Sequence, residues 1–186
     1  MFEILQNIDE HWLLLINQHF SPVLDYLMIF STGTLSWLPL YILLLYLIIR
    51  KFRMKAILVL LMVALTVTLT DQLSVHLFKE VFLRLRPCHH PDLQDSIRTI
   101  IGCGGKYGFV SSHAANSAGL VTFLLLVFRP MNMILALFLI VYVLLNMVSR
   151  VYLGVHYPFD VLGGAFLGII CGLTTSHLTK FLISKF

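Results

Sequence analysis

The chain has 186 residues, of which 59% are hydrophobic and only 12% are charged. Soluble globular domains carry about 25% charged residues, and the apolar residues here form long unbroken runs, so the composition excludes an ordinary soluble domain and indicates bilayer-spanning helices. The net charge of +4 comes from basic residues at the ends of apolar runs, not from one solvated face, which argues against nucleic-acid binding.

The first 32 residues predict helices that lie at the membrane surface. Apolar residues recur there at helical spacing, with polar residues between them: Leu5, Ile8, Trp12, Leu15 and Ile16. This is the pattern of an amphipathic interfacial helix. The apolar stretch 22–30 is too short to cross alone and is interpreted as an interfacial or re-entrant piece. A crossing formed by residues 12–32 remains an alternative.

Five further segments approach the roughly 20 apolar residues that a bilayer crossing needs. They are 35–49, 56–77, 112–128, 131–148 and 159–178. We therefore expect one all-α membrane domain over residues 1–186, a polytopic transmembrane bundle of five crossings, or of six if residues 12–32 also cross.

Basic residues set the expected orientation of this bundle. They lie between segments 35–49 and 56–77, between segments 112–128 and 131–148, and near the chain end: Arg50, Lys51, Arg53, Lys55, Arg129, Lys180 and Lys185. The positive-inside rule places these residues on the cytoplasmic side. The polar loop 78–110 and the turn 150–158 then face the extracytoplasmic side of what we expect to be a bacterial inner membrane.

Three polar clusters lie at the outer ends of the expected crossings, where ionisable groups are costly and need a reason. Lys79 and Arg86 are seven residues apart, so they share a face if the second helix continues to Pro87, which would end it. Taken alone, they could be interfacial anchors. Ser111 and Ser112 can cap the third crossing and leave its N–H groups free for an anion, with His113 in the first turn.

The third cluster runs from Arg150 to Asp160. Gly154 allows a turn, and Pro158 suits the first position of the last crossing. Asp160 then lies one helical turn inside, close enough to accept a hydrogen bond from the imidazole of His156. A histidine oriented in this way exposes its other ring nitrogen as a nucleophile. The alternative is that Asp160 only stabilises the helix N-terminus and that His156 has no catalytic role.

Together the clusters read Lys-x6-Arg-Pro, Ser-x-His and Ser-Arg-x5-His-x3-Asp, in that order. This order resembles the type-2 phosphatidic acid phosphatase superfamily, which includes bacterial lipid phosphatases, glucose-6-phosphatase and vanadium-dependent haloperoxidases. The resemblance implies a membrane-embedded lipid phosphatase, because the hydropathy argues against a soluble peroxidase.

The resemblance also implies a role for each site residue. His156 would be the nucleophile, His113 the acid and base, and Asp160 the group that orients His156. The substrate phosphate would be bound by Lys79, Arg86, Arg150, Ser111 and Ser112. No metal or cofactor is expected, because the three cations neutralise the phosphate. Two positions depart from the family pattern Pro-Ser-Gly-His: Val110 stands where the family has proline, and Ser112 stands where the family has glycine.

The expected partners are the bilayer and a lipid phosphate, and the substrate stays open. Undecaprenyl diphosphate is preferred over phosphatidylglycerol phosphate, phosphatidate and a lipid A phosphate. A phosphate or anion transporter, which should show broken helices at the midplane, and a catalytically inactive lipid-binding relative are the alternatives.

Other polar residues of the loop and of the second crossing can be explained by structural roles. Cys88 and Cys103 could form a disulfide or remain free thiols. His89, His90 and Asp92 lack a second ligand pair at zinc spacing and are expected to shape the substrate mouth. Asp71 is expected to pack against Asn116 or Asn146.

Overall fold

The computed structural model describes residues 2–185, and this part of the chain is helical apart from its connections and one isolated bridge, Leu85 to Tyr107. The long helices are α1 (Phe2–Gln18), α2 (Pro22–Thr32), α3 (Leu38–Phe52), α4 (Ala56–Leu73), α6 (Ser112–Val127), α7 (Met133–Tyr152) and α8 (Pro158–Lys185). Short helical pieces are η1 (Leu35–Trp37), η2 (Arg53–Lys55), η3 (Ser74–Lys79), α5 (Glu80–Phe82) and η4 (Pro87–His89). The expected all-α bundle is confirmed.

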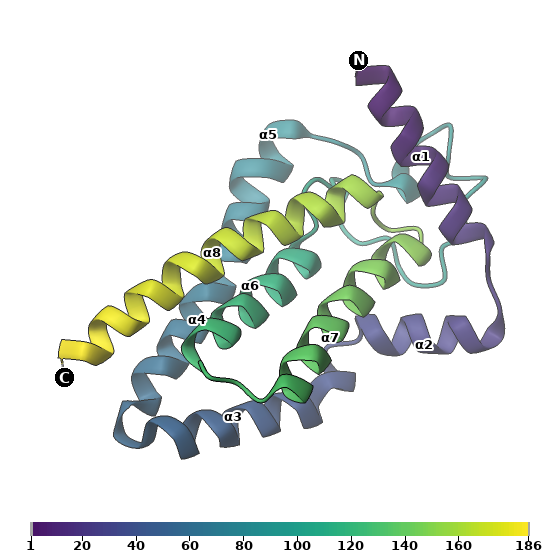
Figure 1. Ribbon diagram of the computed structural model, residues 1–186. Coiled ribbons are helices and arrows are strands. Elements are labelled where there is room, and N and C mark those ends of the chain that lie inside the picture. Colours follow the sequence, from purple (N-terminus) through teal and green to yellow (C-terminus); the bar gives the residue numbers. More distant parts are fainter. Residues whose placement is uncertain (1, 186) are drawn as a thin grey trace.

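Helix α6 lies at the centre, with α8 and α7 on either side (Figure 1). Small residues let the backbones of α6 and α8 touch: a Cβ added to Gly168 would lie 2.3 Å from the carbonyl oxygen of Ala115. One added to Gly164 would lie 2.4 Å from the carbonyl oxygen of Ser111. Such packing is typical of membrane helices, where dispersion contacts replace the hydrophobic effect. It fixes the first turn of α6 against the second and third turns of α8.

Buried hydroxyl and amide groups join α4 to this pair. Thr66 hydrogen-bonds to Thr175 of α8 at 2.7 Å, and Thr70 donates to Asn116 of α6 at 2.6 Å. Asn116 therefore bonds to Thr70, and among the described residues no hydrogen bond joins Asp71 to Asn116 or to Asn146, the two polar partners named for it. The side chain of Asp71 is half-buried and accepts a long hydrogen bond from its neighbour Gln72.

Helices α1 and α2 are separate and bend by 117° relative to each other, so residues 12–32 do not form one straight helix. The side of α1 that faces the protein carries Asp9, Leu13 and Asn17, all buried. Four apolar residues of the sequence pattern are exposed instead, namely Leu5, Ile8, Trp12 and Leu15, whereas Ile16 is half-buried against the core. Side chains of this kind suit contact with lipid.

Three helical stretches are long and apolar enough to cross a membrane: Leu35–Phe82, Met133–Tyr152 and Pro158–Lys185. The bent pair α1 and α2 makes a fourth if it counts as one span, and α6 is apolar but shorter. The first stretch turns at Arg53, which has a positive φ of 50° and separates α3 from α4. Each of the five expected crossings is thus a helix, while their number in the bilayer stays a prediction.

Helix boundaries differ from expectation by up to seven residues, and the two largest differences are at the ends of the second and the last expected crossing. Helical structure continues from α4 through η3 and α5 to Phe82, so the polar loop begins five residues later than the expected residue 78. Helix α8 runs seven residues beyond 178, because Ser176 and Thr179 remain buried against the bundle and the helix has no reason to stop there.

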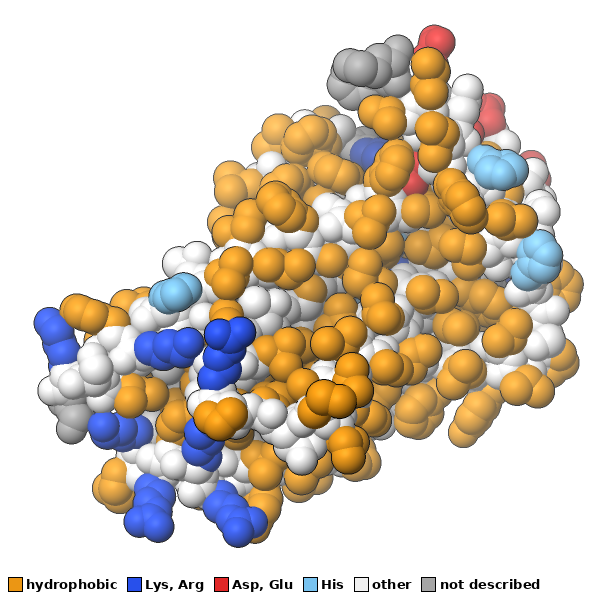
Figure 2. All heavy atoms as spheres, viewed as in Figure 1, with side chains coloured by type: hydrophobic (Ala, Val, Ile, Leu, Met, Phe, Trp, Pro, Cys, Tyr) orange, Lys and Arg blue, Asp and Glu red, His pale blue; other side chains and the backbone are white. Residues whose placement is uncertain are grey.

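The surface is divided between apolar and charged regions (Figure 2). Hydrophobic side chains cover the middle of the molecule, and Lys and Arg gather at the end where α8 terminates. Lys55 Nζ donates to the carbonyl of Ile183 at 3.0 Å, which joins the α3–α4 turn to that end. The acidic side chains in this view lie at the opposite end, near the N-terminus.

Candidate active site

Four helix ends meet at the end of the bundle opposite the one where α8 terminates. These are the ends of η3 and α7 and the starts of α6 and α8. The loop from Leu83 to Ser111 covers them. The polar clusters predicted from the sequence are therefore neighbours in space.

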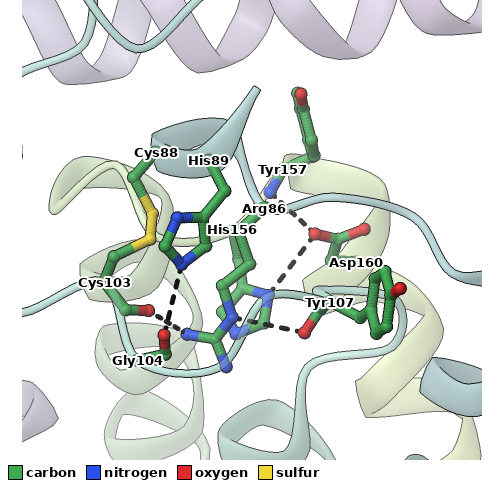
Figure 3. The surroundings of a disulfide bond; sticks show 9 residues. All are labelled: Arg86, Cys88, His89, Cys103, Gly104, Tyr107, His156, Tyr157 and Asp160. Atoms are coloured by element: carbon green, nitrogen blue, oxygen red, sulfur yellow. Dashed lines mark hydrogen bonds and ion pairs between the residues drawn. A yellow bond between two sulfur atoms is a disulfide. The ribbon is translucent and has the colours of Figure 1, made fainter. Parts of the chain in front are cut away.

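His156 and Asp160 form the centre of this site (Figure 3). Both side chains are buried, and His156 Nδ1 lies 3.4 Å from Asp160 Oδ2. The backbone N–H of Tyr157 donates to the same oxygen at 3.0 Å. An ionised carboxylate only accepts hydrogen bonds, so this contact places the imidazole proton on Nδ1 and leaves Nε2 with a free lone pair. The expected contact between the two residues is confirmed.

The three predicted cations surround His156. Burial lowers the pKa of His156 well below its usual range, and the positive charges of Arg86, Arg150 and Lys79 lower it further. Each of these charges is close enough to act on the imidazole, which is kept neutral. The site therefore places the unprotonated Nε2 of His156 among cations that attract an anion.

Arg86 reaches the site by a different route from the one expected. Leu83 adopts a left-handed conformation and ends α5, and the following residues pair with the chain near Tyr107 in extended form. The prediction that Lys79 and Arg86 share one helix face up to Pro87 was therefore wrong. Arg86 is held by the carbonyl oxygens of Cys103 at 2.6 Å and Tyr107 at 3.3 Å.

Lys79 donates a hydrogen bond to Ser112, which stands where the family pattern has glycine. Lys79 Nζ donates to Ser112 Oγ at 2.6 Å, and Ser74 Oγ lies 2.6 Å from the same hydroxyl. A glycine at this position could not accept that hydrogen bond. The extra hydroxyl thus fixes the lysine ammonium next to the start of α6.

Ser111 is the N-cap residue of α6, but its side chain makes no capping hydrogen bond. Its N–H donates to the backbone oxygen of Asp160 at 2.9 Å. The expected cap is therefore absent, and the N–H groups that the helix start leaves open belong to Ser112, His113 and Ala114. Within residues 2–185, Ser111 Oγ is a buried polar atom without a hydrogen-bond partner.

Arg150 comes from the last turn of α7 and is 6% exposed. One of its terminal nitrogens donates to Thr32 Oγ1 at 2.7 Å. Its Nε is buried and has no partner among the described residues. Unpaired buried donors are costly, so both this atom and Ser111 Oγ are suited to a ligand.

His113 opens into a cavity of about 380 Å³ between α2, α3, α6 and α7. Aromatic and aliphatic groups line this cavity together with side-chain amides and hydroxyl groups: Trp37, Tyr41, Tyr142, Val67, Leu120, Asn116, Asn146, Thr32 and Ser117. Its size is in the range of small-molecule sites.

Two charged residues of the site were missed by the sequence interpretation. Arg84 donates to Asp160 Oδ1 at 2.8 Å and to Asp9 Oδ2 at 2.6 Å. Arg84 occupies an unspecified position between Lys79 and Arg86, and Asp9 lies 151 residues before Asp160, so neither carried a signal in the sequence. A charged residue in the apolar pattern of α1 was the only hint.

The loop contains a disulfide between Cys88 and Cys103, with their Cα atoms 6.1 Å apart. This resolves the alternative left open by the sequence. His89 contacts the carbonyl of Gly104 at 3.2 Å, and His90 lies 4.0 Å from Asp92. No group of three metal-ligating side chains comes together in the described part of the chain.

The model of the PAP2 superfamily matches residues 55–183. The chain belongs to the PAP2 superfamily. The crystal structure of a transmembrane PAP2 type phosphatidylglycerolphosphate phosphatase from Bacillus subtilis has the same fold, with a TM-score of 0.71 and 23% identity over 95% of this chain and 87% of that one. The Aquifex aeolicus LpxE structure gives a TM-score of 0.64 and 25% identity over 89% of this chain and 92% of that one. The chain is an integral membrane protein of this family.

Two curated relatives are both called lipid A 4'-phosphatase. The protein from Bacteroides thetaiotaomicron is 39% identical over 132 residues, which are 69% of this chain and 59% of that protein. The protein from Porphyromonas gingivalis is 35% identical over 129 residues, which are 68% of this chain and 55% of that protein. The PAP2 chain thus spans less than two thirds of the length of these relatives.

Proposed function

We propose that the protein is a membrane lipid phosphatase that hydrolyses a phosphomonoester through a phosphohistidine at His156. The observation that carries this proposal is the neutral, buried His156, oriented by Asp160 and surrounded by Lys79, Arg86 and Arg150. The cations around this nucleophile favour an anionic substrate, and a phosphate monoester is an anion with an electrophilic phosphorus atom.

Phosphate binding would use the donors that have no partner within the protein. Arg150 Nε and Ser111 Oγ are both buried and unpaired in the described structure. The open N–H groups at the start of α6 add a positive helix end. Charge-assisted hydrogen bonds from Lys79 and Arg86 complete the set. These groups are fixed before the substrate arrives, so they stabilise the charge that develops on the phosphoryl oxygens.

The reaction would have two steps. His156 Nε2 attacks phosphorus as the ester bond to the leaving oxygen breaks, and His113 gives its proton to that oxygen. His113 then takes a proton from water, the water oxygen attacks phosphorus, and the bond between phosphorus and nitrogen breaks to release phosphate. Asp160 stabilises the positive charge that forms on the His156 ring in the first step.

The leaving group would lie in the cavity next to His113, since the acid must reach the leaving oxygen. The lining of aromatic rings and amides suits a ring that carries hydroxyl and amide groups, and the names of the two curated relatives support the same class. We therefore infer that the substrate is a phosphate on a lipid A type sugar. This choice replaces the sequence-based preference for undecaprenyl diphosphate.

We further propose that the active site faces the extracytoplasmic side of a bacterial inner membrane. The Lys and Arg residues at the opposite end of the bundle support this orientation, and the loop disulfide suits an oxidising compartment. A single cysteine introduced at Lys106, which is exposed, should react with a membrane-impermeant maleimide in intact cells. Protection until the cells are lysed would contradict the orientation.

The function is tested by phosphate release from detergent-purified protein. The substrates are lipid A, phosphatidylglycerol phosphate, phosphatidate and undecaprenyl diphosphate, each with and without EDTA. We expect the highest rate with lipid A, no loss in EDTA, inhibition by vanadate, and an acid-labile phosphoprotein that is lost in His156→Ala. His177→Ala, an exposed residue of α8, serves as the control. Full activity in His156→Ala would disprove the mechanism, and uptake of phosphate into liposomes without hydrolysis would favour a transporter.

A further inference from the structure

Arg84 lies between two buried carboxylates and is not part of the pattern by which the family resemblance was drawn. One guanidinium nitrogen donates to Asp160 Oδ1 at 2.8 Å and the other to Asp9 Oδ2 at 2.6 Å. The guanidinium also stacks over the ring of Tyr157, 4.0 Å from its centroid. Burial disfavours the charged form, but the carboxylates of Asp160 and Asp9 outweigh it and raise the pKa of Arg84. Arg84 is therefore a fixed cation.

The hydrogen bonds of Asp160 are divided between its two oxygens. Oδ1 accepts from Arg84, whereas Oδ2 accepts from the N–H of Tyr157 and faces His156. A carboxylate held at both oxygens cannot rotate about its χ2 angle. Arg84 thereby keeps Oδ2 directed at His156, and the tautomer of the imidazole depends on that direction.

Asp9 brings α1 into the same network. Its side chain is 1% exposed, with Oδ2 bound to Arg84 and Oδ1 bound to the N–H of Phe159 at 2.8 Å. Phe159 lies in the first turn of α8, next to Asp160. Asp9 thus bonds both to the cation and to the backbone that carries Asp160. Asp9 is also outside the region matched by the family model, which begins at residue 55.

We propose that Arg84 and Asp9 are positioning residues for the Asp160–His156 pair, so that α1 is a working part of the active site; this inference rests on the proposed function. A direct phosphate contact by Arg84 is the competing role. Two of its five N–H donors are engaged by carboxylates, which fix the guanidinium towards Asp160 and Asp9. The positioning role uses these contacts as they stand, and the kinetic test separates it from a phosphate contact.

The kinetic test uses Arg84→Gln, Arg84→Lys and the nearly isosteric Asp9→Asn in the full chain. Loss of comparable supporting hydrogen bonds typically costs about 10- to 100-fold in activity. We expect kcat to fall by about 100-fold in Arg84→Gln and about tenfold in Asp9→Asn, with KM changed less than threefold. Arg84→Lys should recover part of kcat. The matched control is Arg98→Gln, which removes the ion pair between Arg98 and Asp25. Neither side chain hydrogen-bonds to His156 or Asp160 in the described structure, so kcat should stay within twofold.

A spectroscopic test does not depend on activity. In protein with ¹⁵N-labelled histidine, the signals of His156, assigned by their absence in His156→Gln, should show a proton on Nδ1 at neutral pH. Arg84→Gln and Asp9→Asn should both shift the ring towards a mixture of tautomers. Retention of the wild-type His156 signals in both variants would overturn the inference, even if kcat falls. A rise in KM with unchanged kcat in Arg84→Gln would overturn it in favour of a phosphate contact.

Failure of this inference can be distinguished from failure of the proposed function. If wild-type protein releases no phosphate from any lipid, the function is wrong, while the tautomer measurement still tests the role of Arg84. If the wild type is active and both variants keep its kcat, the function stands and the positioning role is disproved. Asp9→Asn keeps the test available if Arg84→Gln does not fold.

Discussion

Arg86 donates a hydrogen bond to the carbonyl oxygen of Cys103 at 2.6 Å, and Cys103 is bonded through its sulfur to Cys88, two residues after Arg86. The disulfide therefore holds the acceptor that orients one of the three cations around His156 (Figure 3). The disulfide of the loop and a side chain that we propose to bind phosphate are in this way linked.

Breaking the disulfide should weaken substrate binding. In Cys88→Ser/Cys103→Ser, or after reduction of the wild type, Arg86 loses a fixed partner and samples other rotamers. A hydrogen bond to a charged group contributes about 1.5–3 kcal/mol, so we expect kcat/KM to fall roughly tenfold or more, measured by phosphate release. Reductant should have no further effect on the double variant, which controls for side reactions. Unchanged kinetics after complete reduction would contradict the link between the disulfide and Arg86.

The helices and the proximity of the candidate site residues could be predicted because their signals are local. Each crossing is a long apolar run, and each polar cluster lies at the end of such a run. The alternation of direction between successive crossings then brings the clusters to one side. The contact between His156 and Asp160 was predicted from a spacing of four residues at a helix start, and the structure confirms it.

The features that were mispredicted depend on tertiary contacts. The segment after Lys79 has no helix-breaking residue before Pro87, yet the chain leaves the helix at Leu83 to pair Leu85 with Tyr107. The role of Asp9 could not be seen, because its partners Arg84 and Phe159 are 75 and 150 residues away. In the sequence, Asp9 was only one polar residue of an amphipathic helix.

Gly108 should be essential because the site has no room for a side chain there. A Cβ at this position would lie 2.9 Å from Asp160 Oδ2 and 3.5 Å from His156 Nδ1. Gly108→Ala should displace the carboxylate and lower kcat by about 100-fold, as misplaced catalytic groups commonly do. Gly105→Ala is the matched control in the same loop, since a Cβ there would have no neighbour within 4 Å. Equal activity of the two variants would show that the pair tolerates the displacement.

Removing the hydroxyl of Ser112 should raise KM with little change in kcat. Ser112→Ala leaves Lys79 without its acceptor at 2.6 Å, and the flexible ammonium must then be ordered by the substrate itself. An effect on binding that is equal in the ground and transition states appears in KM alone. We expect a rise of about tenfold, near 1.4 kcal/mol, in phosphate-release assays. The control is Ser176→Ala, which removes a buried hydroxyl of α8 bound to its own helix and should leave KM unchanged. A loss confined to kcat in Ser112→Ala would contradict the prediction and assign the Ser112 hydroxyl to the chemical step.

The buried, neutral His156 should make the protein less stable in acid. Its pKa is depressed in the folded protein, chiefly by burial, whereas an exposed histidine of the unfolded chain has a pKa near 6.5. Below about pH 6.5 the unfolded state therefore binds a proton that the folded state does not, and the free energy of unfolding falls by up to about 1.4 kcal/mol per pH unit. Thermal unfolding in detergent between pH 8 and 5 should show a shallower acid slope in His156→Gln than in the wild type. His177→Gln, which removes an exposed histidine, should keep the wild-type slope. An identical acid slope in wild type and His156→Gln would mean that His156 gains its proton as easily in the folded site as in the unfolded chain, and the neutral nucleophile would then have to be abandoned.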